Sequence, residues 1–208
     1  MRGMYWKWKQ NYAKPGVFFG SFLVFLNMNR EHVPLWQFGL EHVDLPHTGR
    51  LLDVGCGGGG LLRMVHELEP QLHLTGVDYS PKSVAETLRV NRRGVRDGMV
   101  EAIEGSVSSL PFADNTFDVV TSSESLYFWP CPAEDLKEIA RVLKPGGSLM
   151  ICLDCCDPDR CPEAARRIRG MRVYTPAELV AFASGAGLQD AQCHLQQDSG
   201  RVCLVARR

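Results

Sequence analysis

The sequence lacks an excess of charge of either sign. Its 208 residues contain 23 Lys and Arg against 24 Asp and Glu, for a formal net charge of -1, and they include no long basic run. Domains that bind nucleic acid or anionic membranes by general electrostatic attraction carry basic patches or stripes. We therefore expect no nucleic-acid partner.

The sequence also lacks an apolar run long enough to span a bilayer. Residues 17–28 are apolar and follow Lys7, Lys9 and Lys14, which imitates a signal peptide, but no small-residue cleavage site follows them. We expect a cytoplasmic protein without stable membrane insertion. A helix that lies on a membrane surface is the alternative for this segment.

Internal repeats, low-complexity stretches and interdomain linkers are absent as well. With 45% hydrophobic residues, a chain of 208 residues is long enough for one well-packed domain and short for two. We predict a single domain over residues 1–208, with an N-terminal helical cap at 1–48 and a Rossmann-like core at 49–208. A homodimer is compatible with this prediction.

Disulfides are a further expected absence. The chain has 8 cysteines without a convincing signal sequence, a pattern typical of reduced thiols in a reducing compartment. Cys152, Cys155, Cys156 and Cys161 include a C-x-x-C pair, but their spacing fits no standard four-ligand metal site. We expect buried, inert thiols and no bound metal. Zinc or a soft metalloid at these thiols is the alternative.

A glycine-rich run at residues 55–60 is the most informative feature of the chain. Residues 51–54 before it are typical of a short buried strand, and residues 61–68 after it are typical of a helix. Glycine allows positive φ and the close approach of a ligand to bare backbone. The next expected strand, at 72–77, ends at Asp78, whose carboxylate can accept hydrogen bonds from both hydroxyls of a ribose. This pattern predicts a βαβ unit with a cofactor site.

Two cofactors compete for this pattern. Gly55, Gly57 and Gly60 satisfy the dinucleotide fingerprint G-x-G-x-x-G, which is weak evidence by itself. Asp53 discriminates between the two cofactors. A carboxylate at the end of the first strand repels the pyrophosphate of a dinucleotide and attracts the sulfonium and ammonium groups of S-adenosylmethionine. Asp53 therefore favours the methyl donor.

Five ordered motifs between residues 48 and 155 extend the pattern. They are D-V-G-C-G-G-G from Asp53, G-V-D-Y-S from Gly76, Gly105 and Ser106 ahead of L-P-F, F-D-V-V from Phe117, and R-V-L-K-P-G-G from Arg141. With these motifs the chain resembles the class I S-adenosylmethionine-dependent methyltransferases, in the small-molecule branch that includes the ubiquinone and menaquinone C-methyltransferases. The N/D-P-P-Y motif of relatives that methylate exocyclic amines is absent from residues 122–127.

The residues and the resemblance together imply an α/β fold. We expect a doubly wound, mostly parallel, seven-stranded Rossmann-like sheet with an antiparallel edge strand, helices on both faces and an N-terminal helical lid. Beyond the first βαβ unit, helices are expected at 31–43, 81–91, 132–143 and 176–186, and strands at 100–104, 117–122, 148–154, 188–195 and 201–206. The last two strands are joined by a short turn, so they should pair antiparallel.

Large apolar residues are concentrated before the first core strand. They are Phe18, Phe19, Phe22, Phe25, Trp36 and Phe38. A cofactor cleft at the carboxyl ends of parallel strands needs an apolar roof that excludes water. We therefore predict that residues 1–45 form a lid over the cleft. Packing on the outer helices or in a dimer surface is the alternative.

The resemblance implies a set of cofactor-binding residues. They are Asp53, Gly55, Cys56, Gly57, Gly59, Asp78, Tyr79, Ser80, Ser106, Val107 and Ser123. Within this set, Ser106 and Val107 bind the adenine and Ser123 approaches the methionyl group. Many relatives have an aspartate at the position of Ser106, and a serine hydroxyl is a weaker, uncharged acceptor. The implied cofactor is S-adenosylmethionine, with S-adenosylhomocysteine as its product.

Three residues are candidates for catalysis. Methyl transfer is an in-line displacement in which the enzyme mainly aligns the nucleophile with the methyl group, and a general base is needed only when the nucleophile arrives protonated. Glu124 and Tyr127 follow the fourth strand on the acceptor side, and His32 belongs to the N-terminal helix. A solvated loop carboxylate and a helix-surface histidine are the alternatives for Glu124 and His32.

The sequence thus predicts an S-adenosylmethionine-dependent methyltransferase that acts on a small-molecule acceptor. Three alternatives stay open. They are a nicotinamide-dependent oxidoreductase, a catalytically silent module that binds S-adenosylmethionine, and an enzyme that methylates a thiol or metalloid through the cysteine cluster. Arginines at residues 160–172 would suit an anionic acceptor, although such charges usually form a solvated helix face.

Overall fold

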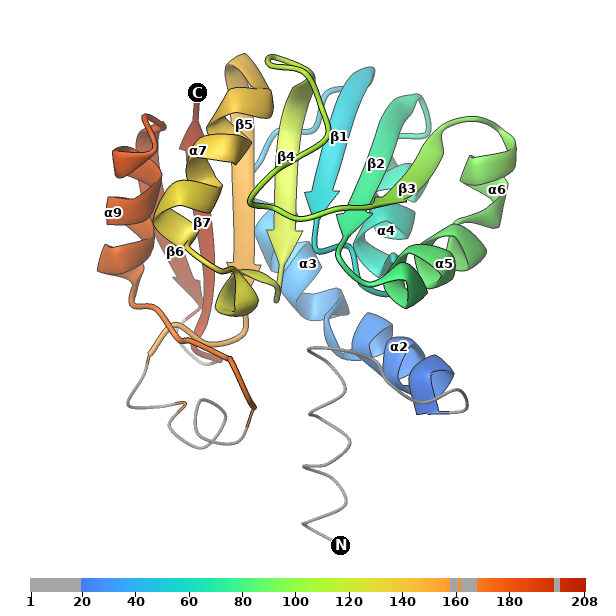
Figure 1. Cartoon of the computed structure of the whole chain (residues 1–208), viewed down its shortest axis with the longest axis horizontal. Coiled ribbons are helices and arrows are strands. Elements are labelled where there is room, and N and C mark those ends of the chain that lie inside the picture. Colours follow the sequence, from blue (N-terminus) through green and yellow to red (C-terminus); the bar gives the residue numbers. More distant parts are fainter. Residues whose placement is uncertain (1–19, 158–160, 162–167, 197–198) are drawn as a thin grey trace, which may run out of the picture.

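A seven-stranded sheet forms the centre of the computed structural model, which describes residues 20–157, 161, 168–196 and 199–208 (Figure 1). The strands are β1 (Gly49–Val54), β2 (Leu72–Asp78), β3 (Val100–Glu104), β4 (Phe117–Ser123), β5 (Leu143–Leu153), β6 (Gln189–Gln196) and β7 (Arg201–Arg207). Their order across the sheet is β3-β2-β1-β4-β5-β7-β6. The strands from β3 to β5 run parallel, as predicted. The antiparallel strand is β7, which pairs with β5 and with the edge strand β6.

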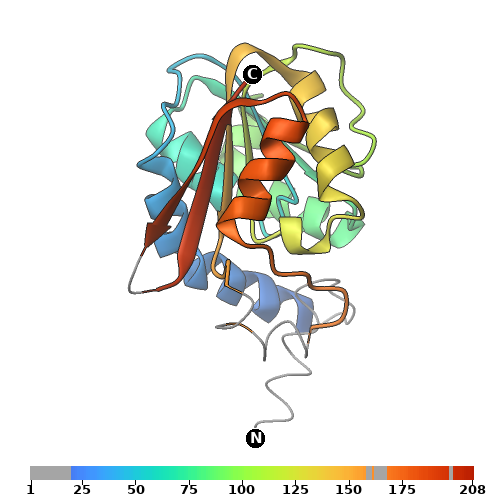
Figure 2. The same ribbon diagram turned by 90° about the vertical axis from the view of Figure 1, so that its left-hand side faces the viewer.

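Helices cover both faces of the sheet, in agreement with the predicted doubly wound fold (Figure 2). On one face lie α7 (Pro132–Val142) and α9 (Pro176–Gly185), and on the other lie α3 (Val33–Leu40) and α4 (Gly60–Leu68). Further helical segments are α2 (Gly20–Glu31), α5 (Pro81–Val90), α6 (Arg92–Arg96) and the 3-10 turn η1 (Leu126–Phe128). No helix within the described residues has the length and apolar character needed to cross a bilayer.

The sheet separates two apolar cores because successive side chains of a strand point to opposite faces. Leu52 and Val120 join the core under α7 and α9, whereas Leu51 and Val119 join the core under α3 and α4. All four side chains are at most 2% exposed. The continuous apolar runs of β1 and β4 therefore reflect burial on both faces, as a doubly wound sheet requires.

The N-terminal region differs from the prediction of one helix at residues 31–43. α2 ends at Glu31 and α3 begins at Val33, with His32 as the N-cap residue between them. Pro34 in the first turn of α3 explains the break, because proline has no N–H and its ring clashes with the carbonyl of the preceding helical turn. The prediction of one helix treated the apolar spacing as continuous across this proline.

α3 lies very close to β5. A Cβ on Gly39 would lie 2.2 Å from Cys152 Sγ and 3.1 Å from Met150 Sδ. Leu35 and Trp36 of the same helix are 0% and 5% exposed. The helix therefore packs against the sheet through a position that has no side chain, and it belongs to the core.

Cys155 and Cys161 form a disulfide, so the prediction that the chain has none is wrong. The Cys161 N–H donates to the Asp157 carbonyl at 2.9 Å, and the Cα atoms of Cys155 and Cys161 lie 6.5 Å apart. That separation is within the range that a disulfide requires. Cys152 and Cys156 are buried and lie outside this disulfide.

Replacing Gly39 with alanine should lower the free energy of unfolding by about 1–3 kcal/mol, because the new methyl group overlaps Cys152 Sγ and overpacks the core. Urea unfolding followed by circular dichroism measures the change. Gly185→Ala in α9 is the matched control, since a Cβ there meets nothing within 4 Å. Adding Cys152→Ala to Gly39→Ala should recover part of the loss. Equal stability of the Gly39→Ala and wild-type proteins would contradict this account of how α3 packs.

Candidate functional site

A cavity of about 540 Å³ opens at the carboxyl ends of β1, β2 and β4. β1 pairs with β2 on one side and with β4 on the other, so the connections that leave these strands diverge at this point. Crevices at such topological switch points are the usual ligand sites of open α/β sheets. Residues of α2, α3, the loop after β3 and η1 complete the lining. The cavity therefore lies beside the glycine turn, where the sequence analysis predicts a cofactor site.

The turn between β1 and α4 presents bare backbone to this cavity. Gly55 and Gly57 have φ values of 77° and 52°, in the left-handed region that favours glycine. The N–H groups of Gly55 and Cys56 donate to the Val77 carbonyl at 2.8 and 3.1 Å, which ties the turn to the end of β2. A Cβ on Gly55 would lie 2.4 Å from Ser125 Cβ. Both the backbone conformation and the lack of space therefore exclude a side chain at Gly55.

Asp78 is fixed at the rim of the cavity by backbone donors. Its Oδ2 accepts a hydrogen bond from the Gly57 N–H at 3.0 Å, and its Oδ1 accepts one from the Ser80 N–H at 2.9 Å. Burial raises the pKa of the carboxyl, and these bonds, together with one from Ser83, oppose the rise. Each carboxylate oxygen can accept further hydrogen bonds. The carboxylate is thus held in one orientation and keeps the capacity to accept further hydrogen bonds.

Asp53 lies deeper, at the end of β1, and is 2% exposed. Burial raises its pKa to about 7, while the Thr121 hydroxyl, which donates to Oδ1 at 2.9 Å, lowers the pKa and the nearby charge of Asp78 raises it. The carboxyl therefore changes charge near neutral pH. A cation in the cavity would favour the charged form.

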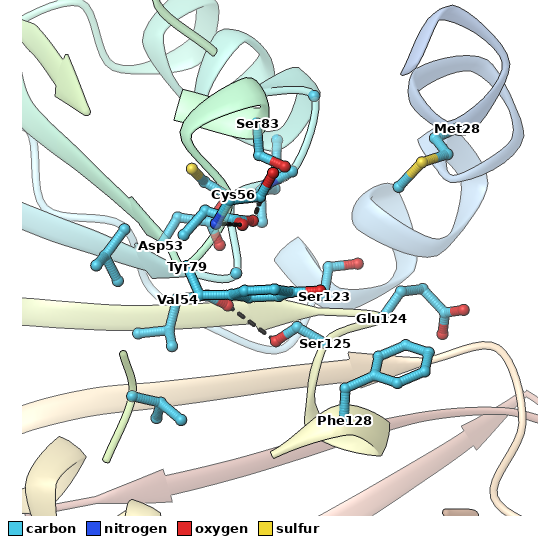
Figure 3. A pocket seen from close by; sticks show the side chains of 18 of the residues that line it. Met28, Asp53, Val54, Cys56, Tyr79, Ser83, Ser123, Glu124, Ser125 and Phe128 are labelled. Carbon is cyan, nitrogen blue, oxygen red and sulfur yellow. Dashed lines mark hydrogen bonds between the residues drawn. The ribbon is translucent and has the colours of Figure 1, made fainter. Parts of the chain in front are cut away.

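The N-terminal helices cover the cavity on the side opposite the sheet. Trp36 Nε1 of α3 donates to Ser123 Oγ at 3.0 Å, and Asn29 Nδ2 of α2 donates to the Gly58 carbonyl at 2.9 Å. Phe25 is 3% exposed and lines the cavity with them. Figure 3 shows Met28 reaching from α2 toward the glycine turn. These contacts form an apolar roof with two polar attachments to the core.

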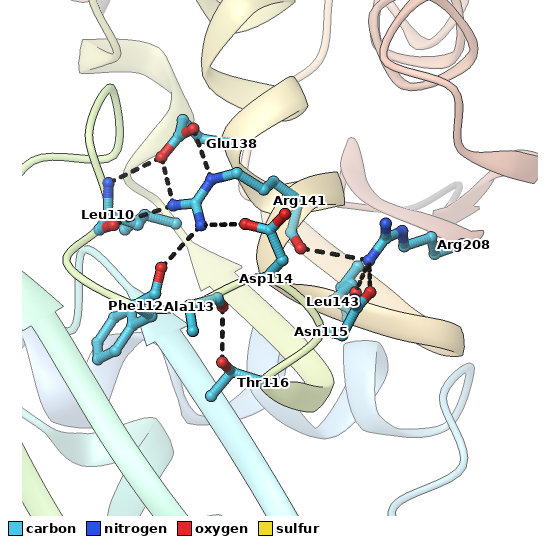
Figure 4. A network of polar contacts seen from close by, with 10 residues as sticks. All are labelled: Leu110, Phe112, Ala113, Asp114, Asn115, Thr116, Glu138, Arg141, Leu143 and Arg208. Atoms are coloured by element: carbon cyan, nitrogen blue, oxygen red, sulfur yellow. Dashed lines mark hydrogen bonds and ion pairs between the residues drawn. The ribbon is translucent and has the colours of Figure 1, made fainter.

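The loop that carries Ser106 and Val107 is attached to α7 by Arg141 (Figure 4). The guanidinium donates to the carbonyls of Phe112 and Leu110 at 2.7 and 3.0 Å, and it forms ion pairs with Asp114 and Glu138. A planar guanidinium with five donors is suited to such multiple contacts. The arginine of the R-V-L-K-P-G-G motif therefore holds one wall of the cavity in place.

Most of the predicted site residues converge on the cavity. The predicted residues that line it are His32, Asp53, Gly55, Cys56, Gly57, Asp78, Tyr79, Ser80, Ser106, Val107, Ser123 and Glu124. They come from segments far apart in the sequence, so their meeting is a result of the fold. Their individual roles in binding and catalysis stay predictions.

Gly59 and Tyr127 are placed elsewhere. A Cβ on Gly59 would lie 2.7 Å from the Thr87 Cα, so this glycine allows α4 to approach α5. The Tyr127 side chain is 1% exposed, and its hydroxyl donates to the Cys155 carbonyl at 3.0 Å and accepts from the Cys155 N–H at 2.9 Å. Burial and the charge of Glu124 raise the pKa of the phenol. Tyr127 thus secures the loop after β5 and does not line the cavity, and its catalytic role stays a prediction.

Several lining residues had no sequence signal for a site. They include Met28, Asn29, Ser83, Ser125, Phe128 and Trp129. Phe25 and Trp36 were expected in the lid and do line the cavity, whereas Phe38 packs against the core under α3. The predicted lid residues Phe18 and Phe19 lie outside the described residues. Only the high density of aromatic residues before β1 pointed to this wall.

Comparison with known proteins gives matches to methyltransferases. Residues 52–151 match the methyltransferase domain family. The chain is 40% identical over 113 residues to the demethylmenaquinone methyltransferase of Listeria welshimeri, an alignment that covers 52% of this chain and 46% of the relative. It is 25% identical over 183 residues to the uncharacterized methyltransferase YdaC of Bacillus subtilis, covering 87% of this chain and 95% of the relative. The chain therefore spans less than half of the Listeria protein and nearly all of YdaC.

Solved structures share the fold. A chain in the complex of the Haloferax volcanii Trm112 methyltransferase activator with a methyltransferase matches with a TM-score of 0.79 at 22% identity, over 88% of this chain and 92% of that chain. The geranyl diphosphate C-methyltransferase of Streptomyces coelicolor matches with a TM-score of 0.74 at 16% identity, over 95% of this chain and 87% of that chain. The architecture is therefore shared with these solved structures, and residues 52–151 match the methyltransferase domain family.

The raised pKa of Asp53 should make the protein less stable as the pH rises. Between about pH 4.5 and 7 the native state keeps a proton on Asp53 that the unfolded chain has lost. The free energy of unfolding should therefore fall with a contribution on the order of 1 kcal/mol per pH unit from this group. Urea unfolding of the ligand-free protein at a series of pH values measures the slope.

Asp53→Asn should flatten this pH dependence, because asparagine can still accept the Thr121 bond but does not titrate. Asp118→Asn is the control. Burial raises the pKa of Asp118, but bonds from Lys144 and the Arg50 N–H outweigh burial and the net shift is downward, so its effect on stability lies below this pH range. An unchanged slope in Asp53→Asn would contradict the buried, proton-holding state of Asp53.

Proposed function

We propose that this chain transfers a methyl group from S-adenosylmethionine to a small-molecule acceptor. The observation that carries the proposal is the pair of buried carboxylates at the switch-point cavity, with Asp78 at the rim and Asp53 in the interior. S-adenosylmethionine carries ribose hydroxyls and two positive charges, which are complementary to these groups. The matches to methyltransferases support the same conclusion.

The cavity suggests how the cofactor would bind. Asp78 would accept hydrogen bonds from the ribose hydroxyls, and the backbone of the glycine turn would contact the methionine and ribose portion. Asp53 would balance the positive charge of the cofactor. Ser106 and Val107 would lie along the adenine, with Tyr79, which is 51% exposed, at its edge. Ser123, held by Trp36 Nε1, would face the methionyl end.

The acceptor would enter beside the roof. Phe25, Phe128 and Trp129 give this part of the lining an aromatic character that suits an apolar acceptor. The names demethylmenaquinone methyltransferase and geranyl diphosphate methyltransferase refer to acceptors with an apolar isoprenoid part, although geranyl diphosphate also carries a charged diphosphate. Glu124 and His32 lie on the same side, and one of them would remove a proton if the acceptor arrives protonated.

The chemistry itself requires little beyond alignment and exclusion of water. The acceptor atom attacks the methyl carbon, the carbon–sulfur bond breaks, and the sulfonium becomes a neutral thioether. Trp36 and Phe25 of the roof would keep water from the methyl group, and Asp53 would hold the cofactor's charged end. A nicotinamide oxidoreductase stays disfavoured, because Asp53 would repel a pyrophosphate at the turn.

Asp78→Ala should lower the affinity for S-adenosylmethionine at least about tenfold, since charge-assisted hydrogen bonds of this kind contribute roughly 1.5–3 kcal/mol. Isothermal titration calorimetry measures the affinity, with circular dichroism to verify the fold. Asp97→Ala, at the exposed end of α6, is the control and should bind normally. Titration of the wild-type protein with NADH should give no binding. Normal affinity in a folded Asp78→Ala protein would contradict the ribose assignment.

The roof should become more protected when the cavity is filled. Hydrogen exchange with and without S-adenosylhomocysteine should show slower exchange across α2 and α3 in the complex, because ligand contacts stabilise the closed arrangement. The strands β6 and β7 serve as the internal reference and should not change. Equal exchange across α2 and α3 in both states would show that these helices are a fixed wall and not a lid.

A further inference from the structure

Three side chains with metal-binding atoms meet at the acceptor side of the cavity. They are His32 at the junction of α2 and α3, Glu124 after β4 and Asp154 after β5. One potential ligand atom from each lies within 4.8 Å of the other two. His32 is 8% exposed, and both carboxylates are half-buried. The three groups are therefore a converging set in a partly enclosed place.

The fold fixes the positions of all three groups. β4 and β5 pair in parallel with Ser123 opposite Cys152, so the residues just beyond the two strands are neighbours. The Glu124 N–H donates to the Cys152 carbonyl at 3.0 Å, and Glu124 Oε1 accepts from the Asp154 N–H at 2.6 Å. Glu124 also has a φ of 57°, which is uncommon outside glycine and occurs at functional sites. The carboxylate of Glu124 is thus aimed by a constrained backbone.

The other two groups are held by neighbouring side chains. Arg201 Nε donates to Asp154 Oδ1 at 2.8 Å. The His32 ring packs edge-on against Trp36, with ring centroids 6.1 Å apart, and Trp36 is itself bonded to Ser123 at the end of β4. Outer contacts of this kind orient the ligands of metal sites. The contacts of Trp36 also place His32 beside the two carboxylates, although no local sequence motif contains the three residues.

We propose that His32, Glu124 and Asp154 bind a divalent first-row transition-metal ion such as Mn²⁺. One imidazole with two carboxylates suits such ions, whereas Mg²⁺ and Ca²⁺ prefer oxygen ligands alone. A cation would also be attracted to the two carboxylates, of which Asp154 already pairs with Arg201. Three protein ligands leave coordination positions open toward the cavity that His32 and Glu124 line.

This proposal departs from the expectation of no metal, which weighed only the cysteine cluster. It also extends the proposed function on which its role rests. With an ion bound, His32 and Glu124 are ligands and not the base, and the acceptor's proton would pass to solvent. An ion at this place would bind acceptors through an ionised or ionisable oxygen, such as a phenol or an enol. The ion would lower the pKa of that oxygen and hold it beside the methyl donor.

Mn²⁺ binding to the full chain tests the site directly. Electron paramagnetic resonance should show loss of the free Mn²⁺ signal with one ion bound per chain. Glu124→Gln, Asp154→Asn and His32→Gln should each weaken binding at least about tenfold, because each removes a ligand. Glu41→Gln and His73→Gln, at exposed positions, are the matched controls and should leave binding unchanged. Zn²⁺ should displace Mn²⁺, and Mg²⁺ at the same concentration should not.

Binding of S-adenosylhomocysteine to the metal-free protein is measured in parallel by calorimetry. This separates the two proposals, because loss of cofactor binding would count against the methyltransferase function and not against the metal site. The metal proposal is overturned if Mn²⁺ does not bind with one-to-one stoichiometry. It is also overturned if all three folded ligand variants bind Mn²⁺ as the wild type does, or if Mg²⁺ displaces Mn²⁺ equally well.

Discussion

The close contact between the N-terminal helices and the sheet is the constraint on which the site depends. α3 can lie against β5 only because Gly39 has no side chain to meet Cys152 Sγ. The same helix covers the start of α4, where a Cβ on Gly60 would lie 2.3 Å from the Trp36 ring. Close packing of this kind tolerates little added volume. Gly39 and Gly60 therefore determine how closely α3 approaches β5 and α4, and with it the position of the helices over the cavity.

Two buried carboxyl groups dominate the electrostatics of the cavity. Asp53 is 2% exposed and Asp78 is 8% exposed, and burial raises the pKa of both carboxyls. Charged groups in such a place are costly without a partner. A ligand that carries positive charge supplies the partner, so its binding and the ionisation of Asp53 are thermodynamically linked. The protonation state of Asp53 therefore links the stability of the fold and the binding of a cationic ligand to the pH.

Some features follow from residues that are close together in the chain. The glycine turn, the flanking strand and helix, and Asp78 at the end of β2 were predicted because their signals are local: apolar runs, glycine conformation and a fixed spacing. The capping box at α9 is equally local, since Thr175 and Glu178 bond each other within one turn. By contrast, the break at His32 was missed because the apolar spacing continues across Pro34. The disulfide was missed because the prediction relied on the expected reducing compartment, and the sequence does not show that the fold brings Cys155 and Cys161 together.

The sequence by itself therefore determined the order of strands and helices along the chain, the resemblance to class I methyltransferases and most residues that line the cavity, because each depends on short-range patterns. The tertiary structure alone decided which distant side chains meet. It separated Tyr127 from the cavity, bonded Trp36 to Ser123, and brought His32 to Glu124 and Asp154. Such contacts join residues whose separation along the chain carries no periodic signal. They are set by how helices pack on the sheet and where parallel strands end.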